Sequence, residues 1–175
     1  MIGMDRDPEA LKTAGEALAG LSGRVRLVHG RLGEVARLSR EQDWPAPDAV
    51  LMDLGTSTRQ LKDAARGFSF MAEGPLDMRM DPGSGRSAAE LVNTVSQHDL
   101  ERLFRELGQE RWAGRIARAV VARRPFATTL QLAEVVSRAV PGRGRIHPAT
   151  RVFQALRMAV NDELGELTSA LDTVP

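Results

Sequence analysis

At 175 residues, the chain is long enough for one domain with its own core, or for one domain that carries a modest insertion. Its 24 basic and 23 acidic residues leave a formal net charge of +1, so bulk charge neither requires nor excludes a nucleic acid partner. The absence of cysteine excludes disulfides and thiolate metal sites. Neither a signal sequence nor a membrane-spanning apolar run is recognisable, which predicts a cytoplasmic protein without a membrane partner.

Short apolar runs alternate with helical patterns in the first third of the chain. The runs end at Asp5, His29 and Asp53, 24 residues apart in each case. That interval is close to the length of a strand plus a helix, so the pattern predicts a βαβαβ unit with a parallel sheet. Because right-handed crossovers place the carboxyl ends of parallel strands at one edge, we expect these three side chains to converge on one crevice.

The first helix has a well-defined predicted start. Asp7 is a capping residue, Pro8 suits the first helical position and Glu9 adds an acid in the first turn. Apolar residues at three- and four-residue spacing then predict one buried stripe. These residues are Leu11, Ala14, Leu18 and Leu21. A second helical stretch leads through a proline-rich turn to the third expected strand, at residues 49–52.

From Ser87 onward the sequence shows helical patterns without strand-like alternation. We expect a helical insertion over residues 87–147, interrupted at Pro125 and in the loop of residues 141–148. Pro148 then opens one long return helix with an apolar face. Seven residues on that face are expected to be core: Val152, Phe153, Leu156, Val160, Leu164, Leu167 and Leu171. The predicted domains are therefore a partial α/β domain, residues 1–86 and 148–175, and the insertion.

Acids at the expected strand ends are the first candidates for chemistry. Asp5 fits an acceptor for a ribose diol, although a solvated loop acid would show the same pattern. His29 is expected to be structural. Asp53 could face a cationic cofactor or accept a proton from a substrate amine. Its alternative role is to cap the next turn through the backbone amides of residues 55–57.

Two further patterns carry charge. The run Asp77-Met78-Arg79-Met80-Asp81 is typical of a loop that turns its methionines inward and pairs Arg79 with a neighbouring acid. All basic residues except two are arginines, the side chain that best contacts phosphates. Two groups stand out: Arg111, Arg115 and Arg118 at i, i+4 and i+7, and Arg143, Arg145 and Arg151 around the loop of residues 141–148. Such groups suit an RNA backbone, and solvated helix faces show them as well.

Six segments in collinear order extend over nearly the whole chain. They are Gly3-Met4-Asp5-Arg6-Asp7-Pro8-Glu9-Ala10-Leu11, Val28-His29-Gly30, Met52-Asp53-Leu54-Gly55, Arg66-Gly67-Phe68-Ser69-Phe70, Gly74-Pro75-Leu76-Asp77-Met78-Arg79-Met80-Asp81 and His147-Pro148-Ala149-Thr150-Arg151-Val152-Phe153-Gln154-Ala155-Leu156-Arg157. Together these segments resemble the MraW/RsmH family of S-adenosylmethionine-dependent methyltransferases. The resemblance implies methylation of the exocyclic N4 of a cytidine in small-subunit ribosomal RNA, by a Rossmann-like sheet with a helical insertion.

By position, the resemblance also implies the cofactor-binding residues. Asp5 would contact the ribose of S-adenosylmethionine, and Leu32 would lie beside the adenine. Asp53 and Gln60 would line the cofactor pocket, with Asp53 as the candidate catalytic residue. The loop after Asp53 departs from the family pattern, because Arg59 replaces a proline and Lys62 replaces an acid. No metal site is expected, because the chain lacks cysteine and its three histidines lie in unrelated segments.

The ends of the chain also depart from the family pattern. Family members begin with a strand and a glycine-rich turn that cradles the methionine part of the cofactor, and they finish with further strands. We therefore expect a fragment or degenerate copy with weak cofactor binding and impaired activity, unless a second copy or another polypeptide completes it. Two alternatives stay open. One is half of a dinucleotide-binding oxidoreductase, and the other is a non-catalytic remnant that binds RNA or protein through its arginine-bearing helices.

Overall fold

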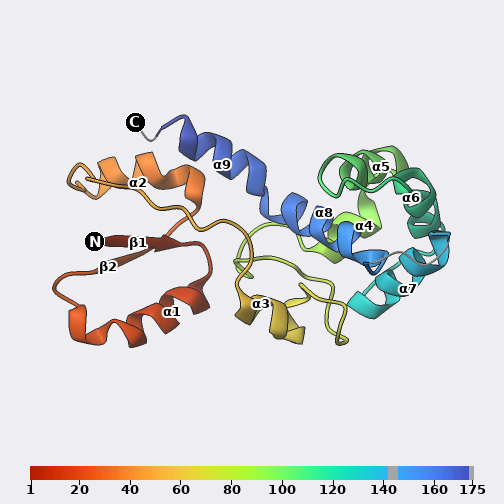
Figure 1. The fold of residues 1–175 in the computed structure, drawn as a ribbon, viewed down its shortest axis with the longest axis horizontal. Coiled ribbons are helices and arrows are strands. Elements are labelled where there is room, and N and C mark those ends of the chain that lie inside the picture. Colours follow the sequence, from red (N-terminus) through yellow and green to blue (C-terminus); the bar gives the residue numbers. More distant parts are fainter. Residues whose placement is uncertain (142–145, 174–175) are drawn as a thin grey trace. The chain divides into compact units, whose positions relative to one another are not determined.

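The computed structural model describes residues 1–141 and 146–173. The chain folds into two compact units (Figure 1). The first unit comprises residues 1–55, residues 80–83 and the chain from residue 162 onward. The second unit comprises residues 56–79 and 84–161. The boundaries of these units differ from those of the predicted domains. The loop after residue 55 and most of the expected return helix belong to the helical unit.

The first unit contains a short parallel sheet of β1 (Ile2–Asp5) and β2 (Arg26–His29). Their connection is α1 (Pro8–Ala17) followed by a 3-10 turn, η1 (Ala19–Leu21). Three further elements complete the unit: a 3-10 turn η2 (Leu32–Glu34), α2 (Val35–Glu41) and α9 (Glu163–Leu171). The mixed α/β character with parallel pairing confirms the predicted class, a partial Rossmann-like fold.

Helix α1 begins as predicted. The Asp7 carboxylate accepts a hydrogen bond from the backbone N–H of Glu9 at 3.0 Å, with Pro8 at the first helical position. The predicted buried stripe is formed only in part, because Leu11, Ala14 and Leu18 are half-buried, whereas Leu21 is 43% exposed and α1 has no fully buried residue. A sheet of two strands offers too little surface to cover one face of a ten-residue helix.

The predicted third strand is not formed. Among the described residues the sheet has two strands, and residues 49–52 join no ladder. In this segment Leu51 is 96% exposed and Val50 is 48% exposed. Each strand of this sheet pairs with the other along one edge and with no described strand along its second edge, so free edges exist, but the backbone of residues 49–52 pairs with neither of them.

The second unit is helical and contains most of the core. Its elements are α3 (Thr58–Lys62), a 3-10 turn η3 (Ala64–Arg66), α4 (Ala88–Thr94), α5 (Gln97–Glu106), α6 (Ala113–Ala122), α7 (Thr129–Ala139) and α8 (Ala149–Asn161). Helices α4 to α7 confirm the helical texture predicted after Ser87. The largest fully buried apolar side chains of the unit are Phe104, Leu76, Met78, Leu100, Ile116, Leu132 and Leu156.

The prediction of a single long return helix is wrong, because the helix is interrupted between α8 and α9. Asp162 has φ +49°, a left-handed conformation that ends one helix and precedes the next. Before it, the buried Asn161 amide donates to the carbonyl of Met78 at 2.7 Å and to that of Arg157 at 2.9 Å. Of the seven expected core residues, Leu164 and Leu171 are exposed, at 51% and 59%.

The loop of residues 67–79 holds its side chains as predicted. Met78 is fully buried, as is Leu76 at 1% exposure. Arg79 pairs with Asp77 through its guanidinium at 2.7 Å and its backbone N–H at 3.0 Å. Burial alone would raise the pKa of Asp77, but these hydrogen bonds lower the pKa below its usual value. The loop is therefore a fixed part of the helical unit.

Candidate functional site

The carboxyl end of the two-stranded sheet brings two of the three predicted positions together. Asp5 pairs with His29 in the parallel register. The Asp5 side chain is exposed, and its Oδ1 accepts a hydrogen bond from the backbone N–H of Asp7 at 2.8 Å. This turn holds one carboxylate oxygen and fixes the side chain at the edge of the sheet. The predicted convergence of these two strand ends is confirmed.

His29 has a structural environment, as expected. Its Nε2 lies 3.1 Å from the carbonyl oxygen of Arg6 and 3.4 Å from Oδ2 of Asp81. A carbonyl oxygen can only accept, so this hydrogen bond requires the proton on Nε2. The ring therefore joins the start of α1 to the segment of residues 80–83.

A network of charged side chains lies beside this edge. Glu166 of α9 forms an ion pair with Arg31, and its Oε2 accepts the backbone N–H of Gly33 at 2.7 Å. Desolvation and the nearby Arg31 lower the pKa of Arg6 from its usual value, while Glu166 and Asp81 oppose that shift. The turn η2, which contains Leu32, is thus fixed from α9.

Leu32 is the first residue of that turn and is half-buried. On its two sides, the backbone N–H of Arg31 donates to Glu34 at 2.9 Å and that of Gly33 donates to Glu166. An apolar side chain on a turn anchored in this way fits contact with a flat ring.

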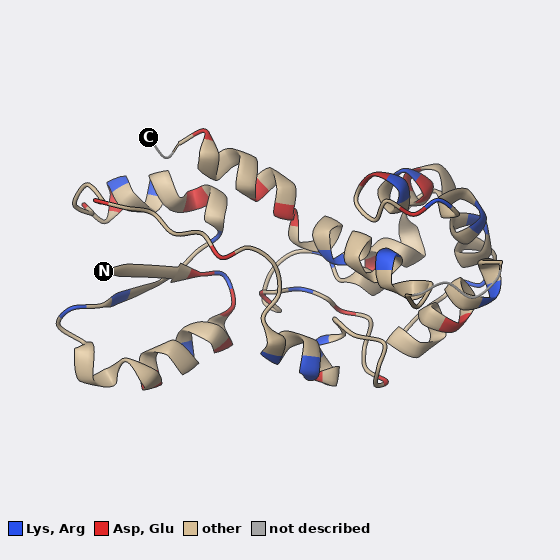
Figure 2. Ribbon diagram, viewed as in Figure 1, with Lys and Arg blue, Asp and Glu red and all other residues tan. Residues whose placement is uncertain are grey.

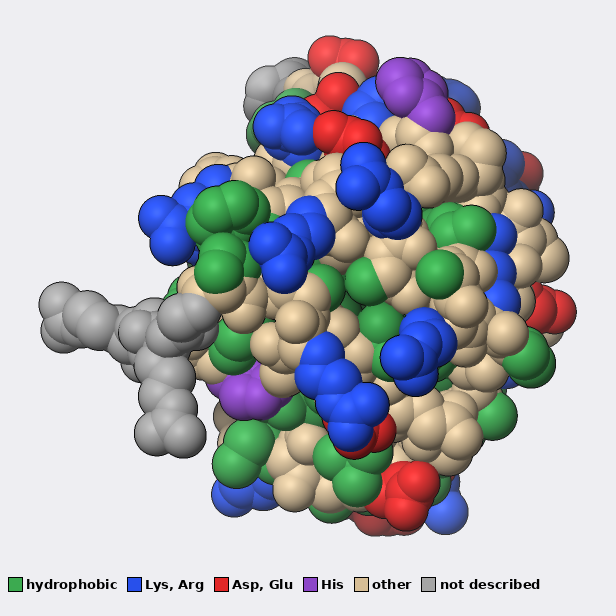
Figure 3. All heavy atoms as spheres, turned by 90° about the vertical axis from the view of Figure 1, so that its right-hand side faces the viewer, with side chains coloured by type: hydrophobic (Ala, Val, Ile, Leu, Met, Phe, Trp, Pro, Cys, Tyr) green, Lys and Arg blue, Asp and Glu red, His purple; other side chains and the backbone are tan. Residues whose placement is uncertain are grey.

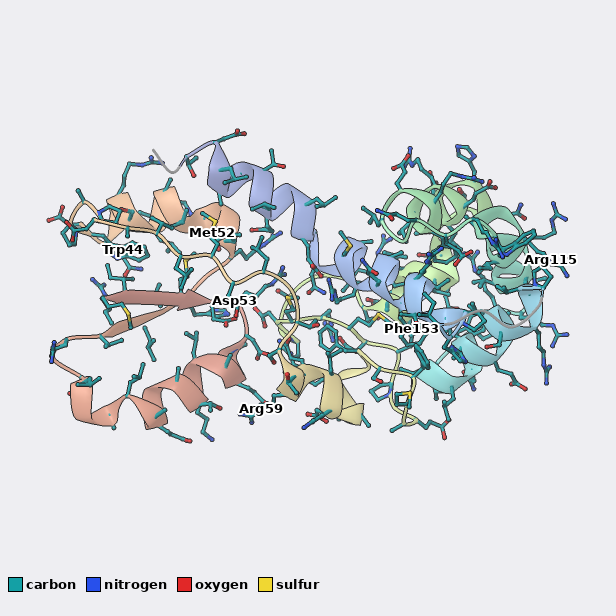
Figure 4. All side chains as sticks on the ribbon, viewed as in Figure 1. Trp44, Met52, Asp53, Arg59, Arg115 and Phe153 are labelled. Atoms are coloured by element: carbon teal, nitrogen blue, oxygen red, sulfur yellow. The ribbon has the colours of Figure 1, made fainter. Side chains whose placement is uncertain are left out.

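Asp53 belongs to the first unit and is exposed. In the view of Figure 4 it is labelled near the carboxyl end of β1. Within the described part of the chain its carboxylate has no hydrogen-bond partner, so the alternative role as a cap is not realised. Ser57 caps the next helix, α3, instead.

Gln60 belongs to the second unit, where it is buried. Its Oε1 accepts the backbone N–H of Ser57 at 3.0 Å, and the Ser57 hydroxyl accepts the N–H of Gln60 at 3.2 Å. This capping box gives Gln60 a structural role in α3. Its predicted contact with the cofactor stays a prediction.

The role of Glu166 was missed from the sequence. It lies 133 positions from Gly33, and no local pattern distinguishes this acid from others on an exposed helix. The sequence indicates only that Glu166 lies in the C-terminal segment that is expected to belong to the α/β domain.

Two features are absent from residues 1–141 and 146–173. None of the helices in these ranges has the length and apolar character that a membrane span requires. No group of three or more His, Cys, Asp or Glu side chains there could hold a metal ion.

Comparisons with known proteins agree over the whole chain. The profile of the MraW methylase family matches residues 1–175. The "Ribosomal RNA small subunit methyltransferase H" of Syntrophotalea carbinolica is 51% identical over 98% of this chain, which covers 56% of that protein. The proteins of the same name from Geotalea uraniireducens and Methylococcus capsulatus are 53% and 48% identical over 98% of this chain, which covers 57% and 59% of their lengths. The chain thus spans somewhat more than half the length of these relatives.

Proposed function

The chain belongs to the MraW methylase family, and from this premise we propose that it takes part in methyl transfer from S-adenosylmethionine to the exocyclic N4 of a cytidine in small-subunit ribosomal RNA. The observation that carries the proposal is the parallel register of Asp5 and His29 at the carboxyl end of the sheet. Ligands bind at this edge in open α/β folds. The printed names of relatives about half identical to this chain support the ribosomal substrate. An oxidoreductase half-domain is not retained, because the family is a methylase family.

The cofactor would be held by residues of the first unit. The Asp5 carboxylate has one oxygen in its turn with Asp7, and its second oxygen suits the hydroxyls of a ribose. Leu32, on its anchored turn, suits the face of an adenine. When bound, S-adenosylmethionine supplies a methyl group already activated by its sulfonium charge.

Asp53 is proposed to act on the amine. The N4 lone pair of cytosine is delocalised into the ring, so positioning of the nitrogen contributes much of the rate. A carboxylate that accepts the N4–H turns the lone pair toward the methyl carbon. Transfer of the methyl group would leave a positive charge on the amine, and the Asp53 carboxylate would take up the N4 proton. An exposed carboxylate without a structural hydrogen bond within the described residues is suited to this role.

The base must leave its stack to reach such a site. We assign the clamp for the extruded nucleotide to the helical unit and the loop of residues 68–81. The burial of Phe68 and Met78 and the Asp77–Arg79 pair give this loop a fixed form. The partner is then the small ribosomal subunit or its RNA, and the compartment is the cytoplasm.

We also propose that this chain by itself binds S-adenosylmethionine weakly and needs a second copy or another polypeptide for full activity. Support comes from Val50, Leu51 and Leu54, which are exposed in the unpaired run after α2. Apolar residues of this kind are expected to be covered in a complete sheet. Calorimetry tests the proposal, and micromolar affinity of the isolated chain would defeat it.

The reaction itself is tested by nucleoside analysis. Small subunits that lack the modification are incubated with a full-length relative and S-adenosylmethionine, and the RNA is digested for mass spectrometry. We expect N4-methylcytidine as the product and lower yield with this chain alone. A methyl group on C5 of cytosine, or on another base, would reject the proposed chemistry. An incubation without S-adenosylmethionine is the control.

A further inference from the structure

The exposed side of α6 differs in charge from the exposed sides of the neighbouring helices. Residues 111–124 contain five arginines and no acid. Arg115 and Arg118 are exposed, and their spacing of three residues places them on one side of α6. Arg111 is also exposed and lies in the turn that precedes the helix. We call these three residues the α6 arginine face. Figure 4 labels Arg115 at the outer edge of the second unit.

The opposite side of α6 fixes the helix in the core. Ile116, Ala117 and Val120 are fully buried, and α6 packs against α5 and α7. The exposed arginines therefore project from a helix whose backbone cannot easily turn away. At its start, the Arg111 guanidinium lies 5.2 Å from the centre of the Trp112 ring, which orders this side chain as well.

Arginines on neighbouring helices are neutralised by acids one turn away. On α5, Arg105 pairs with Glu101 at 2.6 Å and Arg102 pairs with Asp99 at 3.3 Å. On α7, Arg138 pairs with Glu134. Within the described ranges, 1–141 and 146–173, no ion pair is formed by the α6 arginine face. Two acids close to α6 are engaged elsewhere: Glu101, which lies beside Gly114, pairs with Arg105, and the buried Glu110 accepts the N–H of Trp112 at 2.9 Å.

Arg124, at the end of the same basic segment, and Arg151, beside the loop of residues 141–148, do not extend this face. Arg124 is turned inward, where it donates to the carbonyls of Val92 and Val95. Arg151 donates to the carbonyl of Gln109 at 3.2 Å. Arg143 and Arg145 lie outside the described residues.

The figures agree with this contrast. Figure 2 shows both charge colours on α5 and α7. Figure 3 shows the side of the second unit that carries α6, with Lys and Arg spread over its centre and Asp and Glu mainly toward its margins. A basic surface of this kind, built on a segment that contains no acid, is complementary to a polyanion.

We propose that the α6 arginine face binds the phosphate backbone of the RNA substrate. Guanidinium groups pair with phosphate oxygens through two parallel hydrogen bonds and release counterions from the RNA. Such contacts carry little sequence information, so the face positions the RNA while other residues select the base. The identity of the RNA rests on the proposed function, whereas the phosphate contact rests on the charges of α6.

The test compares two triple variants with the same change of charge. One is Arg111→Gln, Arg115→Gln and Arg118→Gln, and the control is Arg102→Gln, Arg105→Gln and Arg138→Gln. Binding of a fluorescent fragment of small-subunit ribosomal RNA is measured by anisotropy at several salt concentrations. The α6 variant is expected to bind about 10- to 100-fold more weakly at 0.1 M salt, and its slope of log K against log salt should fall by about 2. The control variant should keep the slope of the unmodified chain.

Equal slopes for the two variants would overturn the inference, as would the absence of RNA binding by the unmodified chain. Circular dichroism checks that both variants keep their helices. The assay needs no cofactor, so it separates this inference from the proposed function. Arginine-dependent RNA binding without methyl transfer by full-length relatives would reject only the proposed function. If full-length relatives transfer the methyl group but the α6 variant binds RNA as tightly as the unmodified chain, only the assignment of this face would be rejected.

Discussion

Replacement by asparagine of the residue equivalent to Asp53 in a full-length relative is expected to lower single-turnover methyl transfer by about 10²- to 10⁴-fold. Asparagine keeps the size of the side chain but cannot take the proton of the amine. Since Asp53 is exposed and forms no hydrogen bond among the described residues, the free energy of unfolding should change by less than about 0.5 kcal/mol. Rapid-quench measurement of labelled methyl transfer gives the rate.

Asp48 provides the matched control for Asp53. It is an exposed acid in the same segment of the chain, and Asp48→Asn removes the same charge. This variant should keep the unmodified single-turnover rate. An unchanged rate for Asp53→Asn would rule out the proton-accepting role, and an equal loss in both variants would indicate a general effect of charge.

Gly74→Ala is expected to destabilise the helical unit by about 3 kcal/mol or more. A Cβ atom at this position would lie 1.8 Å from the carbonyl oxygen of Ala64 and 2.7 Å from its carbonyl carbon. The backbone cannot shift freely, because Gly74 exchanges hydrogen bonds with Thr129: its N–H donates to the side-chain hydroxyl at 3.2 Å, and its carbonyl accepts the backbone N–H at 3.0 Å.

Unfolding of the helical unit can be followed through Trp112 fluorescence in urea after Trp44 in the first unit is replaced by phenylalanine. Gly20→Ala is the control, because a Cβ there meets no atom within 4 Å. Its effect should stay within about 1 kcal/mol. A midpoint for Gly74→Ala equal to that of the control would show that the contact with Ala64 does not constrain the chain.

Local features of this fold could be predicted from the sequence. The cap at Asp7 and the pair of Asp77 and Arg79 involve residues two positions apart, so residue type and spacing are sufficient to identify them. The parallel register of Asp5 and His29 followed from the repeated interval between apolar runs.

Features that depend on distant partners could not be predicted in this way. Residues 49–52 have the pattern of a strand, but a strand also needs backbone pairing with a neighbouring strand, and these residues join no ladder. The end of α8 depends on Asn161, whose amide reaches a carbonyl 83 positions away. Similarly, the turn that holds Leu32 depends on Glu166, and local periodicity carries no information about such a contact.

The most direct test of the proposed site is the affinity of a full-length relative for S-adenosylhomocysteine and for its analogue without ribose hydroxyls, measured by calorimetry. Substitution by asparagine at the position of Asp5 should weaken binding of S-adenosylhomocysteine by about 10- to 100-fold, since a charged hydrogen bond contributes about 1.5–3 kcal/mol. The same substitution should change the affinity for the analogue very little. As a control, Glu16→Gln, which changes an exposed acid on α1, should alter the affinity for neither ligand. Equal losses for both ligands, or no loss, would contradict the assignment of the sheet edge to the adenosyl group.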